Sequence, residues 1–225
     1  MPSLVVENYL KGLYQIGQRA NDDWVPTGKL AEALKISPGS ATSMLKSLAE
    51  ETPPLVQYKA YQGVKLSKAG EKIALRVLRR HRLIELFLVT TLSLSWDQVH
   101  EEAENMEHAV SDMLVDRIDE FLGHPTSDPH GDPIPSRTGE MRTEAIVTMP
   151  LSSCNPSQEV ELVRVIKQDA TFLQYLSQSK MTIGSVMTVI ENNPTAEIIT
   201  LQIGKKIISL GHPAAESLLV KLIKE

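Results

Sequence analysis

Three of the six histidines fall within 28 residues, and glutamates stand four positions from them. The set comprises His81, Glu85, His100, Glu104, Glu107 and His108. Side chains four residues apart share one face of a helix. Imidazole and carboxylate without thiolate suit divalent metals such as Mn²⁺ or Fe²⁺. One such pair is usually a surface ion pair, but this many groups on two consecutive helices favour a metal site. The other histidines, beside Pro or Gly, are interpreted as exposed and structural: His124, His130 and His212.

Helices are needed to position these groups, and apolar residues recur at helical spacing along much of the chain. Thr27 is an expected N-cap, and Ser95 with Gln98 forms a capping box. The spacing predicts helices over residues 4–18, 27–36, 38–50, 68–94 and 95–122.

A short helix, a turn at Ser37-Pro38-Gly39, a second helix and a hairpin around Gln62-Gly63 follow the order of a winged helix-turn-helix. In that fold the second helix enters the major groove and the wing touches phosphate. Protein contact is the alternative use of the same fold. The candidate DNA-binding residues are Thr27, Ser37, Pro38, Ser40, Thr42, Ser43, Lys46, Lys59, Tyr61 and Lys65.

Charge is distributed unevenly along the chain. Residues 1–80 carry a net charge of +5, residues 81–145 carry −10, and residues 146–225 carry none. A basic N-terminal part can meet phosphates, and an acidic middle part can hold cations. Solvated helix faces are the alternative explanation of both charge runs.

The C-terminal part has a different character. Residues 124–145 are rich in Pro and Gly and are expected to form an extended linker. Short β-rich runs at 159–166, 185–192, 197–204 and 206–211, with a helix near 170–179, indicate a small barrel. The expected domains are residues 1–75, 76–145 and 146–225.

Composition restricts the class of protein. The chain is 42% hydrophobic and 23% charged, and its single cysteine excludes an internal disulfide and a cysteine-based zinc site. We find no apolar run of about 18 residues and no signal peptide, so we expect a cytoplasmic protein without membrane contact.

Several motifs together resemble the diphtheria toxin repressor (DtxR) and manganese transport regulator (MntR) family. They are ENYLKGLY at 7–14, LAEALKISPGSATSMLKSL at 30–48, YQGVKLSKAGEKIA at 61–74, HRLIELFL at 81–88, VHEEAENMEH at 99–108 and PHGDPIP at 129–135. The resemblance implies a mainly α protein with a winged helix-turn-helix, a helical metal-binding and dimerisation domain, and a β-rich SH3-like (FeoA-like) small barrel. It also implies a homodimeric repressor that binds operator DNA when metal-loaded and controls metal-uptake genes.

The resemblance assigns two metal sites, and therefore two ions per subunit. The primary site is Asn8, Glu104, Glu107 and His108, and the ancillary site is His81, Glu85 and His100, completed near Gln168–Thr171. Glu104 stands where the iron branch has Cys, so Mn²⁺ is favoured and Fe²⁺ is the alternative cofactor. Lys11 replaces a ligating Glu of the manganese branch, which favours two separated sites over a two-metal cluster.

Two other classes of function were weighed. A metal-independent winged-helix regulator would use its acidic helices only for dimerisation. A metalloenzyme is disfavoured because the chain lacks the H-E-x-x-H, G-x-S-x-G and P-loop motifs, and no organic cofactor is expected.

Overall fold

The computed structural model describes residues 3–20, 22–142 and 146–224. The chain divides into two compact units. The N-terminal unit contains Met1–His81, Glu107–Val110 and Pro135–Glu140, and the second unit contains Arg82–Met106, Ser111–Ile134 and Met141–Glu225. Within the described ranges, no helix has the length and apolar character needed to cross a bilayer.

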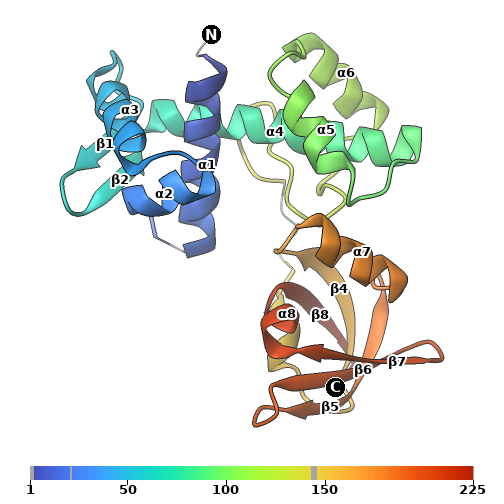
Figure 1. The fold of residues 1–225 in the computed structure, drawn as a ribbon. Coiled ribbons are helices and arrows are strands. Elements are labelled where there is room, and N and C mark those ends of the chain that lie inside the picture. Colours follow the sequence, from blue (N-terminus) through green and yellow to red (C-terminus); the bar gives the residue numbers. More distant parts are fainter. Residues whose placement is uncertain (1–2, 21, 143–145, 225) are drawn as a thin grey trace. The chain divides into compact units, whose positions relative to one another are not determined.

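The N-terminal unit is a winged helix-turn-helix, as the sequence predicts. Its elements are α1 (Leu4–Ala20), α2 (Thr27–Ala33), α3 (Pro38–Glu50), β1 (Val56–Lys59), β2 (Gly63–Leu66) and the start of α4 (Lys68–Leu92). In Figure 1, α2 and α3 pack beside α1, and the β1–β2 hairpin forms the wing. Its core is built from leucines and valines, among them Leu10, Leu13, Leu30, Leu45 and Val64.

Local chemistry explains where these elements begin. The Ser37 hydroxyl caps α3 by accepting from the backbone N–H of Ser40 at 3.0 Å. The expected N-cap at Thr27 is wrong: Pro26 holds that position, and Thr27 is the first helical residue. Proline has no side-chain acceptor, so the first N–H groups of α2 receive no side-chain cap.

The wing is fastened to the rest of the unit through Val25. Val25 and Val64 exchange backbone hydrogen bonds of 2.8 and 3.0 Å. Gly63 beside them has a φ of +125°, and a Cβ there would lie 2.4 Å from the Val25 carbonyl oxygen. Glycine is therefore required at this position.

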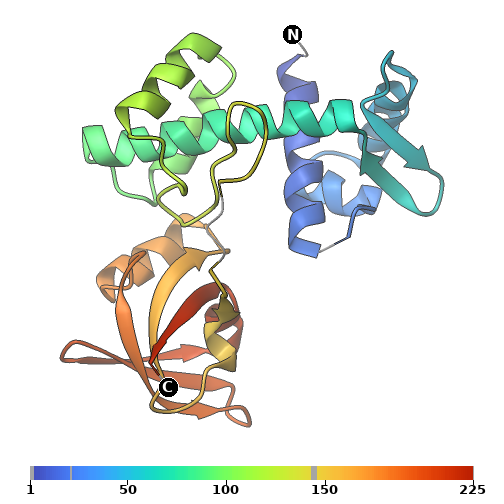
Figure 2. The ribbon, with the colours of Figure 1, turned by 180° about the vertical axis from the view of Figure 1, so that it is seen from behind.

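The helical part of the second unit differs from the prediction of one helix over 95–122. Two helices form instead, α5 (Val99–Met106) and α6 (Asp112–Phe121), beside the C-terminal half of α4 (Figure 2). Ser111 caps α6 by accepting from the Leu114 N–H at 3.2 Å. This cap starts a new helix and leaves Glu107–Val110 as a turn.

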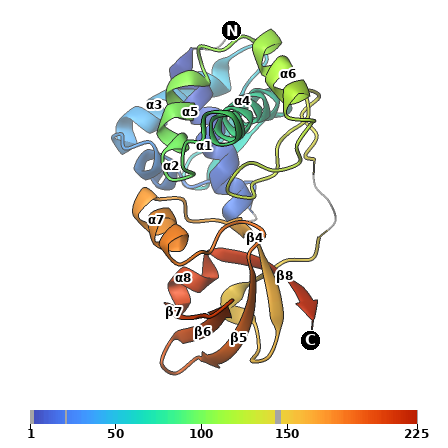
Figure 3. The same cartoon turned by 90° about the vertical axis from the view of Figure 1, so that its right-hand side faces the viewer.

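The β domain of the second unit is a six-stranded antiparallel sheet in the order β3-β8-β4-β5-β6-β7. Its elements are β3 (Met149–Pro150), η1 (Leu151–Ser153), β4 (Glu159–Val165), α7 (Ala170–Gln178), β5 (Val186–Asn193), β6 (Ile198–Ile203), β7 (Lys206–Gly211), α8 (His212–Glu216) and β8 (Leu218–Lys224). Figure 3 shows α8 against the sheet. The four predicted strands and the predicted helix are confirmed, whereas β3, α8 and β8 were not predicted.

Residues 124–134 of the expected extended linker form no helix or named strand, but they are not extended: the chain folds back through a turn at residues 129–130, and residues 143–145 of that linker lie outside the described residues. Ser127 and Pro133 form an isolated antiparallel bridge. His130 between them is completely buried, so its interpretation as an exposed loop residue is wrong. It stacks on Trp96, with ring centroids 5.9 Å apart, and Trp96 belongs to the core of the β domain.

Candidate metal centre

The first candidate metal site surrounds His108 in the N-terminal unit. The Nε2 atom of His108 lies 2.8 Å from Oδ1 of Asn8 and 3.0 Å from Oε1 of Glu107. Helix α1 supplies Asn8, and the turn after α5 supplies Glu107 and His108. One imidazole nitrogen and two oxygens therefore converge, and this donor set fits a divalent cation of intermediate hardness.

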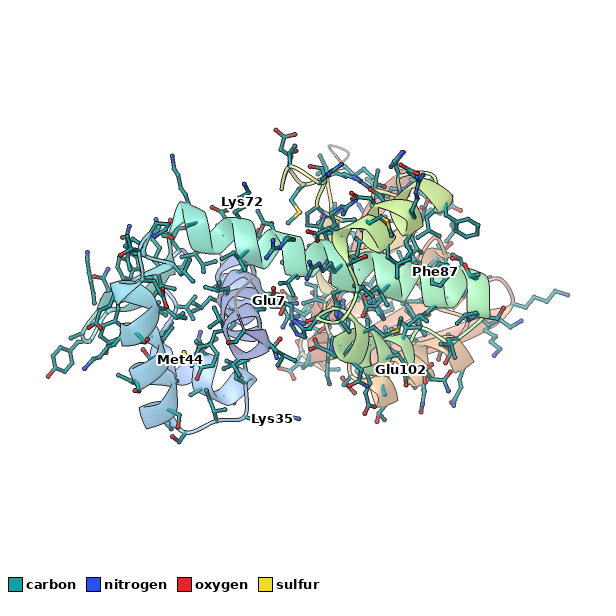
Figure 4. All side chains as sticks on the ribbon, turned by 90° about the horizontal axis from the view of Figure 1, so that it is seen from above. Glu7, Lys35, Met44, Lys72, Phe87 and Glu102 are labelled. Carbon is teal, nitrogen blue, oxygen red and sulfur yellow. The ribbon has the colours of Figure 1, made fainter. Side chains whose placement is uncertain are left out.

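The other nitrogen of this imidazole is held by a carboxylate. Nδ1 of His108 lies 2.7 Å from Oε2 of Glu7, which is almost completely buried. The second oxygen of Glu7 faces Arg76 and Arg80 of α4 at 3.7 and 4.0 Å. In Figure 4 Glu7 lies on α1 where that helix meets α4. A carboxylate on the far nitrogen is the usual support of a metal-ligating histidine.

Glu107 is the most enclosed group of this site, with no solvent exposure. Its Oε1 lies 2.6 Å from Nζ of Lys11, and its Oε2 lies 2.7 Å from Nδ1 of His81. Burial by itself raises the pKa of the Glu107 carboxyl. The hydrogen bond and charge of His81, with those of Lys11, outweigh burial and hold this pKa below its ordinary value. Glu107 is thus a buried carboxylate surrounded by nitrogen donors.

The second unit contains a different group of potential ligands. Glu85, Asp128 and His130 are all buried, and each offers one ligand atom within 4.8 Å of the others. Nε2 of His130 lies 2.9 Å from the carbonyl oxygen of Trp96, which fixes Nε2 as the donor. Among the described residues, Nδ1 has no hydrogen-bond partner, and it lies 3.7 Å from Glu85 and 4.0 Å from Asp128. An orphaned buried nitrogen facing two carboxylates fits a cation between them.

The pKa values of this group are shifted because its buried carboxylates lie close to one another. Burial, followed by the charges of Asp132 and Glu85, raises the pKa of Asp128 to about 7. Burial lowers the pKa of His130, but Glu85 and Asp128 outweigh it and raise this pKa to about 9. In the absence of metal, protonated His130 and the guanidinium of Arg82, 3.7 Å from Asp128, supply positive charge to these carboxylates.

Two further predicted ligands of the second unit, His100 and Glu104, lie on α5. Nδ1 of His100 is 3.1 Å from Oε1 of Glu85, and Nε2 of His100 is 3.9 Å from Glu104. Gln168, named as part of the ancillary site, donates to Asp132 at 3.0 Å. Sequence analysis missed Glu7, Asp128 and His130 as site residues. Their neighbours are distant in sequence, and Glu7 and His108 are 101 residues apart.

The predicted DNA-binding residues lie at the start of α2, on α3 with its N-cap, and on the wing. Seven are exposed: Ser37, Pro38, Ser40, Ser43, Lys46, Lys59 and Tyr61. Thr27, Thr42 and Lys65 are partly buried. The Thr42 hydroxyl donates to the Pro38 carbonyl at 2.8 Å, and Lys65 is paired with Asp23. Lys46 and Lys59 stay at the surface over the rings of Tyr58 and Trp24.

Family models match most of the chain. The iron dependent repressor N-terminal DNA binding domain matches residues 2–64, the iron dependent repressor metal binding and dimerisation domain matches residues 67–136, and the FeoA domain matches residues 149–222. A solved structure described as a manganese-dependent transcriptional repressor in complex with manganese is 36% identical, with a TM-score of 0.86. The match covers 97% of this chain and 100% of that one. The chain belongs to the DtxR/MntR family.

Other members of the DtxR/MntR family are similar over 54% to 99% of the chain. The iron-dependent repressor IdeR of Mycobacterium leprae is 25% identical over 96% of both chains. The transcriptional regulator MntR of Lysinibacillus sphaericus is 30% identical over 54% of this chain and 84% of that one. The structure of ScaR with bound Zn²⁺ is 31% identical, with a TM-score of 0.79, and covers 99% of this chain and 100% of that one.

Membership in the DtxR/MntR family establishes the function of the protein in general terms. The protein is a metal-dependent transcriptional repressor that binds DNA and divalent metal, and the family is not enzymatic. The three family domains follow one another in the order winged helix-turn-helix, helical domain and FeoA-like β domain.

Proposed function

We propose that this protein is a manganese-responsive repressor, which acts in the cytoplasm as a homodimer and shuts off metal-uptake genes when loaded with Mn²⁺. The convergence of Asn8, Glu107 and His108 carries the proposal, because two oxygens and one imidazole nitrogen suit Mn²⁺. The only cysteine, Cys154, is buried in the core of the β domain. A thiolate, which would favour softer metals, is therefore not part of either donor set.

The regulatory ion is proposed to bind Asn8, Glu107 and His108, with Glu104 as the fourth ligand that the family resemblance assigns. A bound divalent ion supplies positive charge that holds these donors together. The chain's own residues prepare this arrangement. Glu7 fixes the ring of His108 through Nδ1 and leaves Nε2 directed toward Asn8 and Glu107.

A second ion is proposed at Glu85. The resemblance assigns His81 and His100 to it, whereas the buried atoms of Asp128 and His130 favour a set composed of Glu85, Asp128 and His130. Both proposed ligand sets include Glu85. Substitution of the residues that the sets do not share therefore shows which set binds the ion.

The proposed coupling to DNA follows from the position of α1. This helix carries Asn8 and packs against α2 within the winged helix-turn-helix, so an ion shared by Asn8 and His108 ties the DNA-reading part to the Glu107–Val110 turn. In a dimer, two reading heads must lie about 34 Å apart to enter successive major grooves. The ion would act by favouring the conformer that has this spacing.

The homodimer is supported by the match to a dimerisation domain and by apolar side chains on α6. Met113 and Phe121 are 73% and 69% exposed, and Leu114 between them is also exposed. Exposed apolar groups clustered on one helix are typical of an interface. We propose that α6 contributes to the dimer contact.

Fluorescence anisotropy with DNA from a metal-transporter promoter tests the proposed function. Binding is measured at fixed salt in EDTA and then with Mn²⁺, with Zn²⁺, and anaerobically with Fe²⁺. We expect tight binding only with metal, at the lowest free concentration for Mn²⁺, and loss of this response in His108→Ala. Equal binding in EDTA and Mn²⁺ would identify a metal-independent winged-helix regulator, and activation first by Fe²⁺ would overturn the manganese assignment.

A further inference from the structure

Lys11 occupies an unusual place for a lysine. It lies on α1 and is 5% exposed, and its Nζ is 2.6 Å from Oε1 of Glu107, which has no exposure at all. Lysine is rarely buried unless it is paired with an opposite charge. Here the paired charge is one of the proposed ligands of the regulatory ion.

The ammonium of Lys11 and the imidazole of His108 reach the same oxygen. Oε1 of Glu107 lies 2.6 Å from Nζ of Lys11 and 3.0 Å from Nε2 of His108, while Oε2 is taken by His81. A carboxylate oxygen has about two lone-pair directions, and the Lys11 ammonium occupies one of them. Because Nε2 of His108 is itself a proposed ligand, an ion held between His108 and this oxygen would lie beside the ammonium, and the two positive charges would repel each other.

Helix α1 presents the ligand and the ammonium together. Asn8 and Lys11 are three residues apart and thus share one face of α1. The other charges of the site are already engaged, because Glu7 faces Arg76, Arg80 and His108. In the described structure the Glu107 carboxylate is contacted by His81, His108 and Lys11. Of these, Lys11 carries a positive charge that does not require protonation of an imidazole.

We propose that Lys11 is an internal cation that holds Glu107 in the metal-free protein and must be displaced by the incoming divalent ion. The lysine thereby weakens metal binding and sets the free metal concentration at which the repressor loads. Its flexible four-carbon stem lets the ammonium move toward water while the stem stays buried. In this exchange the contact of Lys11 with Glu107 is lost, whereas Asn8, which already lies 2.8 Å from His108, becomes a ligand of the ion. The inference rests on the proposed function of this site.

Direct measurement of Mn²⁺ affinity tests the exchange without DNA. The full-length protein is titrated with MnCl₂ against a fluorescent chelator, and bound metal is counted by mass spectrometry. Lys11→Gln removes the charge and is expected to tighten Mn²⁺ binding by roughly tenfold or more, because a competing charge is lost. A merely structural lysine predicts the opposite sign, since its loss would disturb the ligands and weaken binding.

Two matched variants complete the design. Lys11→Arg keeps the charge and is expected to stay within about threefold of the wild type, and Lys72→Gln makes the same neutral substitution at an exposed position of α4. An unchanged or weaker affinity in Lys11→Gln would overturn the inference.

A measurement on the wild type covers the case in which Lys11→Gln does not fold in EDTA. The ammonium ¹⁵N resonance of Lys11, assigned by its loss in Lys11→Arg, is followed while diamagnetic Zn²⁺ is added. We expect this resonance to shift or broaden in step with loading, and a resonance that stays unchanged would overturn the inference. If the proposed function is wrong, the result is distinguishable from failure of the Lys11 inference. In that case wild type and His108→Ala would bind Mn²⁺ equally weakly.

Discussion

The Nδ1 atom of His108 lies 2.7 Å from Oε2 of Glu7, so the first helix of the winged helix-turn-helix orients the imidazole. Outer carboxylates of this kind fix the tautomer and the ring angle of a ligating histidine, and their loss typically costs 10- to 100-fold in metal affinity. Glu7 is therefore expected to support the proposed metal site without being one of its ligands.

Glu7→Gln is expected to weaken Mn²⁺ binding by roughly tenfold or more, because the amide holds the ring less firmly and leaves Arg76 and Arg80 without their carboxylate. Isothermal calorimetry with MnCl₂ measures the change. Glu71→Gln, an exposed substitution on α4, is the control and should bind as the wild type does. Equal affinities in the two variants would remove Glu7 from the metal centre.

Stability of the metal-free protein should fall as pH rises from about 6.5 to about 9. The pKa of His130 is about 9 in the folded protein against an ordinary 6.5, so the folded state binds more protons in this interval. Its contribution is complete below pH 6.5 and is lost as pH passes the folded pKa. Urea unfolding in EDTA at several pH values measures the slope, and His130→Gln should flatten it. A slope that His130→Gln leaves intact would assign the effect to other groups.

The two ligand sets proposed for the second ion predict different mutants. If the ion binds Glu85, Asp128 and His130, then Asp128→Asn should reduce bound metal from two ions to one, and His100→Ala should retain two. His100 is partly exposed, whereas Asp128 and His130 are buried. Metal counted after equilibrium dialysis separates the sets. The reverse pattern would favour the ligands that the family resemblance assigns.

Gly63→Ala should destabilise the protein by about 1–3 kcal/mol, because alanine is strained at a φ of +125° and its Cβ would clash with the Val25 carbonyl. DNA affinity should fall as well, since the wing is held at this point. Gly28→Ala is the control, because an added Cβ there meets no described atom within 4 Å. Unfolding by urea measures both, and equal stabilities would contradict the steric argument.

Two lysines of the DNA-binding surface should differ in their effect. Lys46 is exposed on α3, and its replacement by Gln should weaken operator binding and lower the slope of log affinity against log salt by about 1. Lys65 is already paired with Asp23, so Lys65→Gln should change the slope less. Anisotropy titrations over a range of salt concentrations compare them. A larger effect at Lys65 would place the main phosphate contact on the wing rather than on α3.

Much of the fold can be predicted from the sequence where the signals are local. Caps, proline and glycine positions and helical periodicity identify α1, α2, α3 and the wing. The break between α5 and α6 was missed because Val99, Ala103 and Val110 continue a helical spacing across it, while Ser111 alone supplies the new cap. Strand β8 was missed because LLVKLIK is a short apolar run that fits helix and strand equally.

The candidate metal centre shows the same contrast between residues that local sequence signals identify and residues that they do not. Local spacing predicts Glu107 and His108 as ligands, and the family resemblance adds Asn8. The roles of Glu7 and His130 depend on partners brought together from distant parts of the chain, and neither residue lies in a spacing that indicates it. Burial of His130 depends on Trp96 and on the packing of the linker, which proline content alone does not predict.

The stacking of Trp96 on His130 has an optical consequence. The chain has two tryptophans, one in each unit: Trp24 lies beneath the ammonium of Lys59 at the wing, and Trp96 lies against the buried imidazole. Protonated imidazole and bound metal both change the emission of an adjacent indole. The protein thus carries one natural fluorophore at its proposed DNA-binding surface and another at its proposed second cation site, and each can be followed alone once the other is replaced by phenylalanine.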